Sequence, residues 1–276
     1  MRITRTSRRR NGLGTLQAWR YTADAPRGAV FLCPALAGRA GAYDAFSRYL
    51  CRLGLNVWVP QYRLDAGLSL RDWAVGDTTA ALHEFLDSAG TLPKYAVGHS
   101  FGGLFLGLAA ENTRFEKLLL VASPRANVWT FGLRAIPSAA FNFYLKVPLL
   151  WRFRREVSLE GIGLEGRVPA RIAADCARLI RSVRFDHALE ELALPTSHFE
   201  GFTGELLSLC FSDDPLATAG PTRSLALSFK NAACREVRHI DPAAFHVPRV
   251  AHLGFFHRQC QERLWPALVD RFLSFG

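Results

Sequence analysis

The pentapeptide GHSFG (98–102) places a serine between two glycines. Alone, this G-x-S-x-G pattern is a weak signal. Here it ends a strand-like apolar run (94–100) and begins a helix-like run (101–113). Such a turn lifts a serine hydroxyl clear of the sheet, and glycine on either side avoids a collision where strand and helix cross. We therefore predict Ser100 as a nucleophile; the alternatives are an incidental serine in a glycine-rich turn and a dinucleotide-binding turn, whose glycine pattern is missing after the first buried strand.

A serine nucleophile needs a histidine base and an acid that orients the base, in the chain order serine, acid, histidine. The run LCFSDDPL (209–216) places Asp213 and Asp214 at the end of a strand-like segment. We favour Asp214 as the acid and keep Asp213 as the alternative, with the other carboxylate capping the turn. The run VAHLGFF (250–256) then offers His252, whose apolar neighbours favour a neutral ring that accepts a proton.

Seven other histidines compete with His252 for the role of base. His246 and His257 flank the same segment, but His252 lies where the expected chain order places the base. His99 falls inside the glycine-flanked pattern and is expected to pack beside it. The others lie in expected helices, in the last strand or in a long insertion.

Strand-like and helix-like segments alternate through the first 124 residues. The strand-like segments are 29–35, 56–61, 94–100 and 116–123, and the helix-like segments are 42–55, 70–90 and 101–113. This alternation predicts an α/β fold, with a mostly parallel sheet covered by helices on both faces. Two strands that flank Asn11-Gly12 are expected before these segments. After them we expect strands at 205–212 and 234–240 and a helix from about 258 to 273.

The alternation stops at 125–200, after the sixth expected strand. So long an insertion within a domain is usually functional, so we expect a cap over the site, with 1–124 and 201–276 forming the core. Aromatic and leucine side chains are dense in its first third, at Trp129, Phe131, Phe141, Phe143, Tyr144, Leu149, Leu150, Trp151 and Phe153. They either line a pocket for an apolar acyl group or only pack the cap onto the core. Arg152, Arg154 and Arg155 either form a solvated face or meet an anionic substrate.

The whole chain resembles an α/β-hydrolase, and more narrowly the bacterial subgroup labelled predicted α/β-hydrolase or serine aminopeptidase-like. The resemblance rests on GHSFGG (98–103), FSDDPLA (211–217) and AHLGFF (251–256), and it covers roughly residues 10 to 275. It implies Ser100 as nucleophile, Asp214 as acid and His252 as base. The stretch Gln61-Tyr62-Arg63-Leu64 departs from the Asp-Tyr-Arg-Gly usual in the family, which affects the pocket more than the chemistry.

The same resemblance implies where a negatively charged oxygen would be bound. One backbone N–H comes from the residue after the nucleophile, Phe101. The other comes from the loop after the strand at 29–35, where we expect Leu36 first and Ala35 second. Two such donors stabilise a tetrahedral oxyanion by several kcal/mol.

Composition sets outer limits on the function. The 276 residues are 49% apolar and 21% charged, which is ordinary for a globular protein. Neither a transmembrane helix nor a signal peptide is expected. Six scattered cysteines without a C-x-x-C pair predict buried free thiols, a cytoplasmic location and no metal site.

The formal net charge of +10 is concentrated at the start of the chain, where residues 1–28 carry seven arginines and one acid. An edge strand protected by arginines explains this better than an arm for nucleic acid or another anionic surface, because no nucleic-acid module follows.

We therefore predict a serine hydrolase that cleaves a carboxyl ester, or else a thioester or amide, of a small apolar acyl substrate. It would use no metal or organic cofactor and would bind no nucleic acid; the sequence leaves the oligomeric state open. The alternatives are a catalytically weak binding module of the same fold and an anionic-surface binder acting through the arginine-rich N-terminus.

Overall fold

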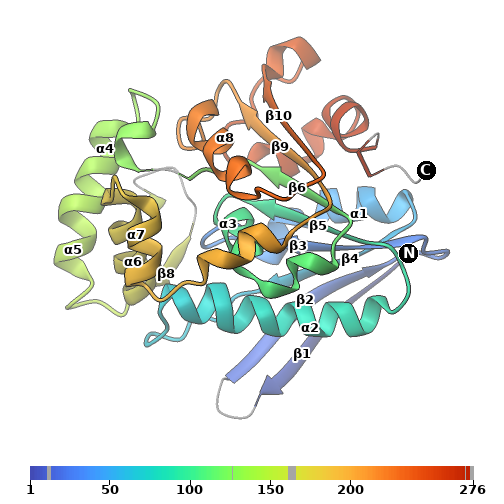
Figure 1. The fold of residues 1–276 in the computed structure, drawn as a ribbon, viewed down its shortest axis with the longest axis horizontal. Coiled ribbons are helices and arrows are strands. Elements are labelled where there is room, and N and C mark those ends of the chain that lie inside the picture. Colours follow the sequence, from blue (N-terminus) through green and yellow to red (C-terminus); the bar gives the residue numbers. More distant parts are fainter. Residues whose placement is uncertain (11–13, 126, 161–165, 271, 274–276) are drawn as a thin grey trace.

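An eight-stranded sheet forms the centre of the molecule in the computed structural model, which describes residues 1–10, 14–125, 127–160, 166–270 and 272–273 (Figure 1). Its strands are β1 (Arg2–Arg10), β2 (Gly14–Thr22), β3 (Gly28–Cys33), β4 (Leu55–Gln61), β5 (Lys94–His99), β6 (Lys117–Val121), β9 (Glu205–Phe211) and β10 (Cys234–Ile240). They lie in the order β1-β2-β4-β3-β5-β6-β9-β10. From β4 to β10 every pair is parallel, whereas β1 and β2 run antiparallel. The predicted α/β class with a mostly parallel sheet is confirmed.

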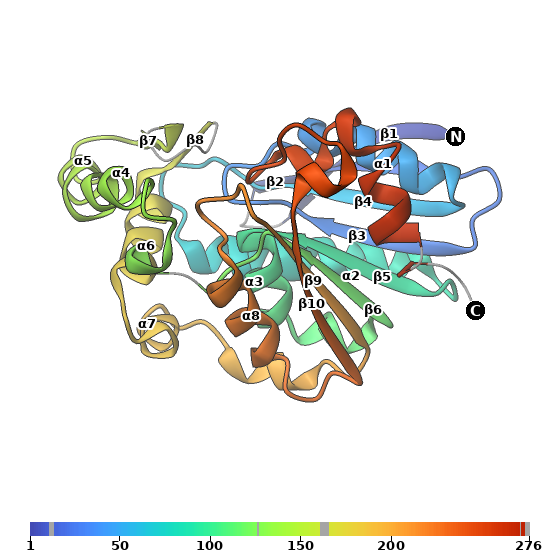
Figure 2. The ribbon, with the colours of Figure 1, turned by 90° about the horizontal axis from the view of Figure 1, so that it is seen from above.

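Helices cover both faces of this sheet (Figure 2). They are α1 (Asp44–Arg52) on one face, and α2 (Thr78–Ala89), α3 (Phe101–Leu108) and α8 (Ala219–Ser228) on the other. The strands supply both cores because their side chains alternate in direction: Phe31 packs with α2 and α3, and its neighbour Leu32 packs with α1. No helix of the described residues is long and apolar enough to cross a bilayer.

The arginine-rich N-terminus forms the edge strand β1, as expected. The β1–β2 register runs from the Arg2–Thr22 pair to the Arg10–Gly14 pair, and the expected turn at Asn11-Gly12 lies outside the described residues. The Arg5 guanidinium lies 4.1 Å from the centre of the Trp19 ring on β2. Arginine on an exposed edge disfavours pairing with a further strand.

The expected C-terminal helix is wrong. Instead of one helix over 258–273, the chain forms a 3₁₀ turn at Arg258–Cys260 and a π-helical turn at Pro266–Asp270. The chain is helical over 264–270, so Pro266 lies within this short run and the interruption of the expected helix falls at 261–263. Trp265 is fully buried and donates its indole N–H to the carbonyl of Phe255 at 2.6 Å.

Between β6 and β9 the chain leaves the sheet and forms a separate group of short elements. These are α4 (Ile136–Ala140), α5 (Val147–Leu150), the paired strands β7 (Glu156–Ser158) and β8 (Arg167–Pro169), α6 (Ala170–Arg181) and α7 (Phe185–Glu191). A π-helical stretch, Phe141–Lys146, joins α4 to α5. The group lies to one side of the sheet in two perpendicular views (Figures 1 and 2).

Candidate active site

Ser100 occupies a strained turn between β5 and α3. Its φ of 53° and ψ of −121° lie outside the regions that side chains usually adopt. Two backbone hydrogen bonds hold this conformation: the Ser100 N–H donates to the Val121 carbonyl at 3.0 Å, and the Gly103 N–H donates to the Ser100 carbonyl at 3.0 Å. Strain of this kind persists only where surrounding contacts fix it, and it is common at functional sites.

Three glycines leave the space that this turn requires. A Cβ on Gly98 would lie 2.5 Å from the Cα of Gly103, and a Cβ on Gly102 would lie 2.1 Å from the carbonyl oxygen of Cys33. Both contacts are with backbone, which cannot give way, so the expectation for these two glycines is confirmed. A Cβ on Gly103 would also meet Ser123 Oγ, at 2.4 Å; the sequence did not predict this contact.

The structure brings Ser100, Asp214 and His252 together from three distant parts of the chain. His252 Nε2 lies 2.8 Å from Ser100 Oγ, and His252 Nδ1 lies 2.8 Å from Asp214 Oδ2. All three residues are buried, with 5%, 3% and 6% of their surface exposed. The competing histidines His246 and His257 are exposed to solvent.

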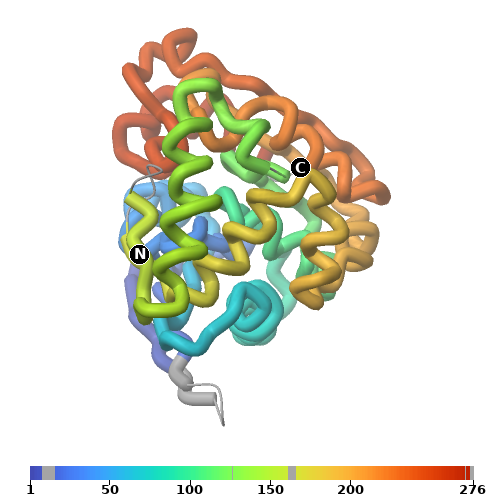
Figure 3. The backbone as a smooth tube through the Cα atoms, turned by 90° about the vertical axis from the view of Figure 1, so that its left-hand side faces the viewer, coloured from blue at the N-terminus to red at the C-terminus, as the bar shows by residue number. Residues whose placement is uncertain are grey.

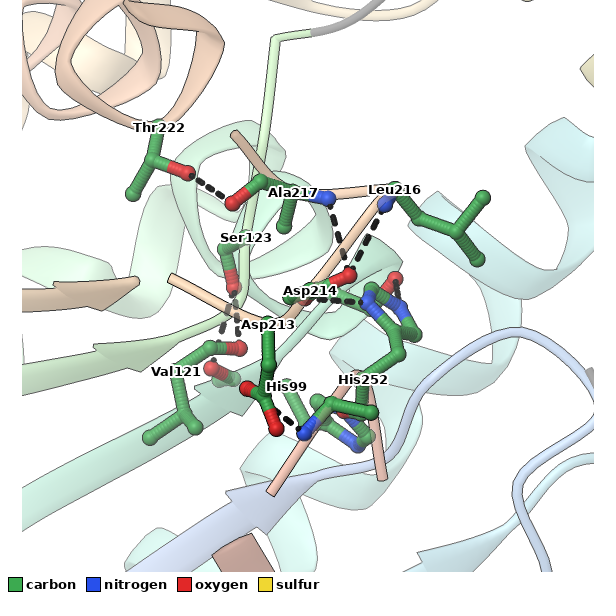
Figure 4. A network of polar contacts seen from close by, with 12 residues as sticks. His99, Val121, Ser123, Asp213, Asp214, Leu216, Ala217, Thr222 and His252 are labelled. Carbon is green, nitrogen blue, oxygen red and sulfur yellow. Dashed lines mark hydrogen bonds and ion pairs between the residues drawn. The ribbon is translucent and has the colours of Figure 1, made fainter. Parts of the chain in front are cut away.

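Asp214 is held by more than the histidine (Figure 4). Its Oδ1 accepts backbone hydrogen bonds from Leu216 at 2.8 Å and Ala217 at 3.2 Å, which leaves Oδ2 to face His252. Burial alone would raise the pKa of this carboxyl, but His252 and the two N–H donors outweigh burial and lower its pKa below the usual range. Asp214 is therefore ionised at neutral pH.

Asp213 points to a different partner. Its two carboxylate oxygens accept hydrogen bonds from the backbone N–H groups of Val250 at 2.8 Å and Ala251 at 2.9 Å. Ala251 has a φ of 48°, a strained conformation directly before His252. Asp213 thus fixes the backbone that carries His252, instead of capping its own turn as the sequence suggested.

The turn after β3 lies next to Ser100. The Gly38 N–H donates to the Ala35 carbonyl at 2.8 Å, and Ala37 has a φ of 61°. The Ala35 N–H is already used, because it donates to the Tyr43 hydroxyl at 2.8 Å. The N–H groups of Leu36 and Phe101 have no acceptor among the described residues, and both residues line a cavity with Ser100. The expected first choice, Leu36, is therefore better placed for an oxyanion than Ala35.

His99 and Tyr43 form a buried hydrogen-bond chain beside the site. His99 Nε2 lies 2.8 Å from the carbonyl oxygen of His252, and His99 Nδ1 lies 2.9 Å from the Tyr43 hydroxyl. A carbonyl only accepts, so Nε2 carries the proton of the neutral ring and Nδ1 accepts from Tyr43. The hydroxyl oxygen of Tyr43 in turn accepts from Ala35. These hydrogen bonds connect the turn that contains Leu36, through Tyr43 and His99, with the backbone of His252.

Replacing His99 is expected to change how stability depends on pH. Burial, with His252 as a smaller cause, lowers the pKa of His99 from 6.5 to about 3. Between these values the unfolded chain binds a proton that the folded chain excludes, so stability is full above pH 6.5 and is lost as the pH falls.

Urea unfolding between about pH 4 and 6 measures this loss as a slope. The unaltered protein should show a slope steeper by up to one proton than His99→Gln. His239→Gln, which removes an exposed histidine of β10, is the control and should keep the steep slope. Equal slopes for the unaltered protein and His99→Gln would contradict the lowered pKa of His99 in the folded protein.

An apolar cavity of about 40 Å³ lies against Ser100 and His252. Six of its lining residues come from the segment between β6 and β9: Pro124, Phe131, Phe143, Leu179, Ile180 and Phe185. A second cavity of about 500 Å³ shares Leu36 with the first and extends to His99 and His257. Ser100 therefore lines the small apolar space, and the larger, more polar one is lined by its neighbour His99 and not by Ser100.

Several residues that the sequence singled out lie away from Ser100. Trp129, Phe141, Tyr144, Leu149, Trp151 and Phe153 are all exposed, so most of the aromatic side chains of this segment do not line the cavity. Arg152, Arg154 and Arg155 are exposed as well, which agrees with a solvated face and not with contact to a substrate at Ser100. Five of the six free cysteines are buried as expected, but Cys234 is exposed. No three His, Cys, Asp or Glu side chains cluster as metal ligands among the described residues.

No protein-family model and no curated protein sequence matches the chain. Solved structures match it closely in fold at low sequence identity. A soluble variant of monoglyceride lipase from Saccharomyces cerevisiae is 11% identical, with a TM-score of 0.62, over 86% of this chain and 85% of that one. A protein from Acinetobacter baumannii described as a lipase is 16% identical, with a TM-score of 0.58, over 93% of this chain and 87% of that one.

A third match covers almost the full length of both proteins. The 2-hydroxy-6-oxo-6-phenylhexa-2,4-dienoate hydrolase of a Rhodococcus strain is 19% identical, with a TM-score of 0.58, over 98% of this chain and 99% of that one. At these identities the likeness concerns the fold, and the serine aminopeptidase-like subgroup stays a prediction. The chain has the α/β-hydrolase fold.

Proposed function

We propose that this protein is a serine hydrolase in which Ser100, His252 and Asp214 form a catalytic triad. The observation that carries the proposal is the pair of 2.8 Å contacts linking Asp214 Oδ2, His252 and Ser100 Oγ. Ser100 attacks an acyl carbonyl while His252 Nε2 takes its proton, and ionised Asp214 accepts from Nδ1–H and stabilises the resulting imidazolium. Protonated His252 then gives the proton to the leaving group, and water hydrolyses the acyl-enzyme.

The oxyanion of the tetrahedral intermediate would be stabilised by the backbone N–H groups of Phe101 and Leu36. Both groups are without a described acceptor, and both residues line the cavity that Ser100 lines. Phe101 is the first residue of α3, so the partial positive charge of the helix N-terminus adds to the field there.

A carboxyl ester is the bond that we propose first, ahead of a thioester or an amide. The support is that several structures with this fold are titled as lipases or esterases, among them a carboxyl esterase from Bacillus coagulans. The apolar lining of the smaller cavity favours an apolar acyl group. A p-nitrophenyl ester assay tests this directly, and failure to turn over any ester, thioester or amide would favour the binding-module alternative.

Residues 125–200 would act as the cap of this site, with residues 1–124 and 201–276 as the core. Phe143, on the helical stretch between α4 and α5, is 1% exposed and lines the cavity beside Ser100. Trp151, eight residues later, is 40% exposed and does not line it. The two residues therefore form a matched pair for testing whether the cap sets acyl-chain specificity.

Phe143→Ala is expected to shift the preferred acyl chain of a p-nitrophenyl ester series to a longer length. Each buried CH₂ contributes about 0.8 kcal/mol, or up to about fourfold in kcat/KM, until the space is full. The cavity is small, so the unaltered enzyme should reach its maximum at a short chain, and removing the Phe143 ring makes room for more carbons.

Trp151→Ala is the control, and it should leave the chain-length profile unchanged. A profile that is the same in Phe143→Ala and in the unaltered enzyme would mean that the cavity does not receive the acyl group. The larger cavity between Leu36 and His257 would then be the better candidate for the acyl site.

A further inference from the structure

One helical stretch of the cap, residues 136–150, exposes a row of apolar side chains. Phe141, Tyr144, Leu145 and Leu149 recur at three- and four-residue spacing, and 44% to 59% of each is exposed. Residues at this spacing lie on one face of a helix. Figure 3 shows this stretch running along the outermost face of the molecule, toward the viewer.

The opposite face of the same stretch already packs onto the protein. Ala139, Phe143 and Val147 are each at most 1% exposed. The outward row is only partly covered by the rest of the chain: the Arg181 guanidinium lies 5.9 Å from the centre of the Tyr144 ring, and about half of each side chain in the row faces solvent. Exposed apolar side chains that gather in one helical row in this way are typical of an interaction site.

Further large apolar side chains lie just before and after this stretch. They are Trp129, Leu133, Trp151 and Phe153, with 61%, 86%, 40% and 79% exposed. We call these four residues and the row Phe141, Tyr144, Leu145 and Leu149 the apolar face. Eight exposed large apolar side chains within 25 residues set this segment apart from the rest of the described surface.

Basic side chains predominate along the segment that carries the apolar face. The sequence has no Asp or Glu from 117 to 155, while 129–155 carries Arg134, Lys146, Arg152, Arg154 and Arg155. Arg171, Arg178 and Arg181 of α6 add to them around a cavity of about 550 Å³ that Trp151 also lines, with Asp175 and Glu191 as its two acids. Apolar aromatic side chains bordered by arginine and lysine match a lipid surface with an apolar acyl region below negatively charged headgroups.

We propose that the apolar face docks on an anionic lipid bilayer, with its rings and leucines in the acyl boundary and its arginines at the phosphate groups. A second copy of the chain fits less well, because two such faces in contact would bring together the five basic side chains that each copy carries over 129–155, a stretch without an acid. Binding of the apolar face to a bilayer does not depend on catalytic activity. If the proposed hydrolase function holds, the inner side of the docked helix, through Phe143, leads to the cavity at Ser100.

Vesicle sedimentation tests the proposal with the full chain. The protein should sediment with vesicles of equimolar phosphatidylglycerol and phosphatidylcholine, and at least about tenfold less tightly with phosphatidylcholine alone. High salt should weaken the binding, because it screens charges at the surface. Ser100→Ala should sediment as the unaltered protein does, which separates this result from the fate of the hydrolase proposal.

Leu145→Asp provides the site-specific arm, and Leu227→Asp provides its matched control. Leu145 is 57% exposed on the apolar face, and Leu227 is 50% exposed on α8. Because both leucines are exposed, the two variants should melt close to the unaltered protein. Leu145→Asp should weaken vesicle binding at least about tenfold while Leu227→Asp should not.

Three results would overturn the proposal. The first is no sedimentation of the unaltered protein with the anionic vesicles, and the second is equal binding by Leu145→Asp. The third is self-association that Leu145→Asp abolishes, without vesicle binding by the unaltered protein, which would assign the apolar face to a second copy.

Discussion

Replacing Ser100 with alanine is expected to lower kcat for ester hydrolysis by about 10⁶-fold, the size of loss that follows removal of a triad nucleophile. The substitution removes the only described hydroxyl that contacts His252 Nε2. Without it no acyl-enzyme can form, and only the oxyanion donors and substrate binding are left to accelerate attack by water.

The loss should come with little change in folding. Ser100→Ala removes one hydrogen bond and leaves the backbone turn as it is, so the free energy of unfolding should change by about 1 kcal/mol or less. Ser212→Ala is the control, because Ser212 is an exposed serine following β9 that contacts Asp241 and not His252. Steady-state kinetics on a p-nitrophenyl ester measures both variants, and an active Ser100→Ala enzyme would remove Ser100 from the mechanism.

Asp214→Asn is expected to lower kcat by about 10⁴-fold. The structure gives the reason. Oδ1 of Asp214 faces the N–H groups of Leu216 and Ala217, so the amide oxygen of asparagine would take that place and its NH₂ would face His252 Nδ1. The imidazole would then carry its proton on Nε2, where it cannot accept the proton of Ser100.

Asp213→Asn is the matched control, since it makes the same chemical change one residue away. It removes one of the two hydrogen bonds from Val250 and Ala251, because the asparagine NH₂ cannot accept, but leaves the hydrogen bond between Asp214 and His252 in place. We expect a loss in kcat of about tenfold or less. The opposite ranking of the two variants, measured with the same ester, would transfer the role of the acid to Asp213.

The parts of the fold that the sequence predicted are those with a strong local signal. Strands such as β3 and β9 are buried on both faces, so they appear as unbroken apolar runs between turns. The glycines beside Ser100 could be predicted because a strand-to-helix crossing leaves no room for side chains. The chain order of nucleophile, acid and base selected the three side chains that the structure brings together.

The missed features depend on contacts between residues that are far apart in the chain. Tyr43 precedes His99 by 56 residues, and His99 lies 153 residues before the carbonyl that it binds, so no local pattern indicates their hydrogen-bond chain. The role of Asp213 likewise depends on backbone N–H groups 37 and 38 residues later.

The aromatic side chains of residues 129–153 show a further limit of sequence reasoning. Phe141 and Phe143 are two residues apart, yet Phe143 is buried at the cavity and Phe141 is 56% exposed. Composition alone treats them alike. The helical spacing of the row formed by Phe141, Tyr144, Leu145 and Leu149 gains meaning only once the opposite face is known to pack onto the core.

Mapping the adduct of a fluorophosphonate probe tests the central claim most directly, because such probes phosphonylate a serine only when a base activates it. We expect one adduct per chain, located by peptide mass spectrometry on Ser100 and missing in both Ser100→Ala and His252→Ala. An adduct on another serine, or no adduct on the folded protein, would contradict the claim that Ser100, His252 and Asp214 act as a catalytic triad.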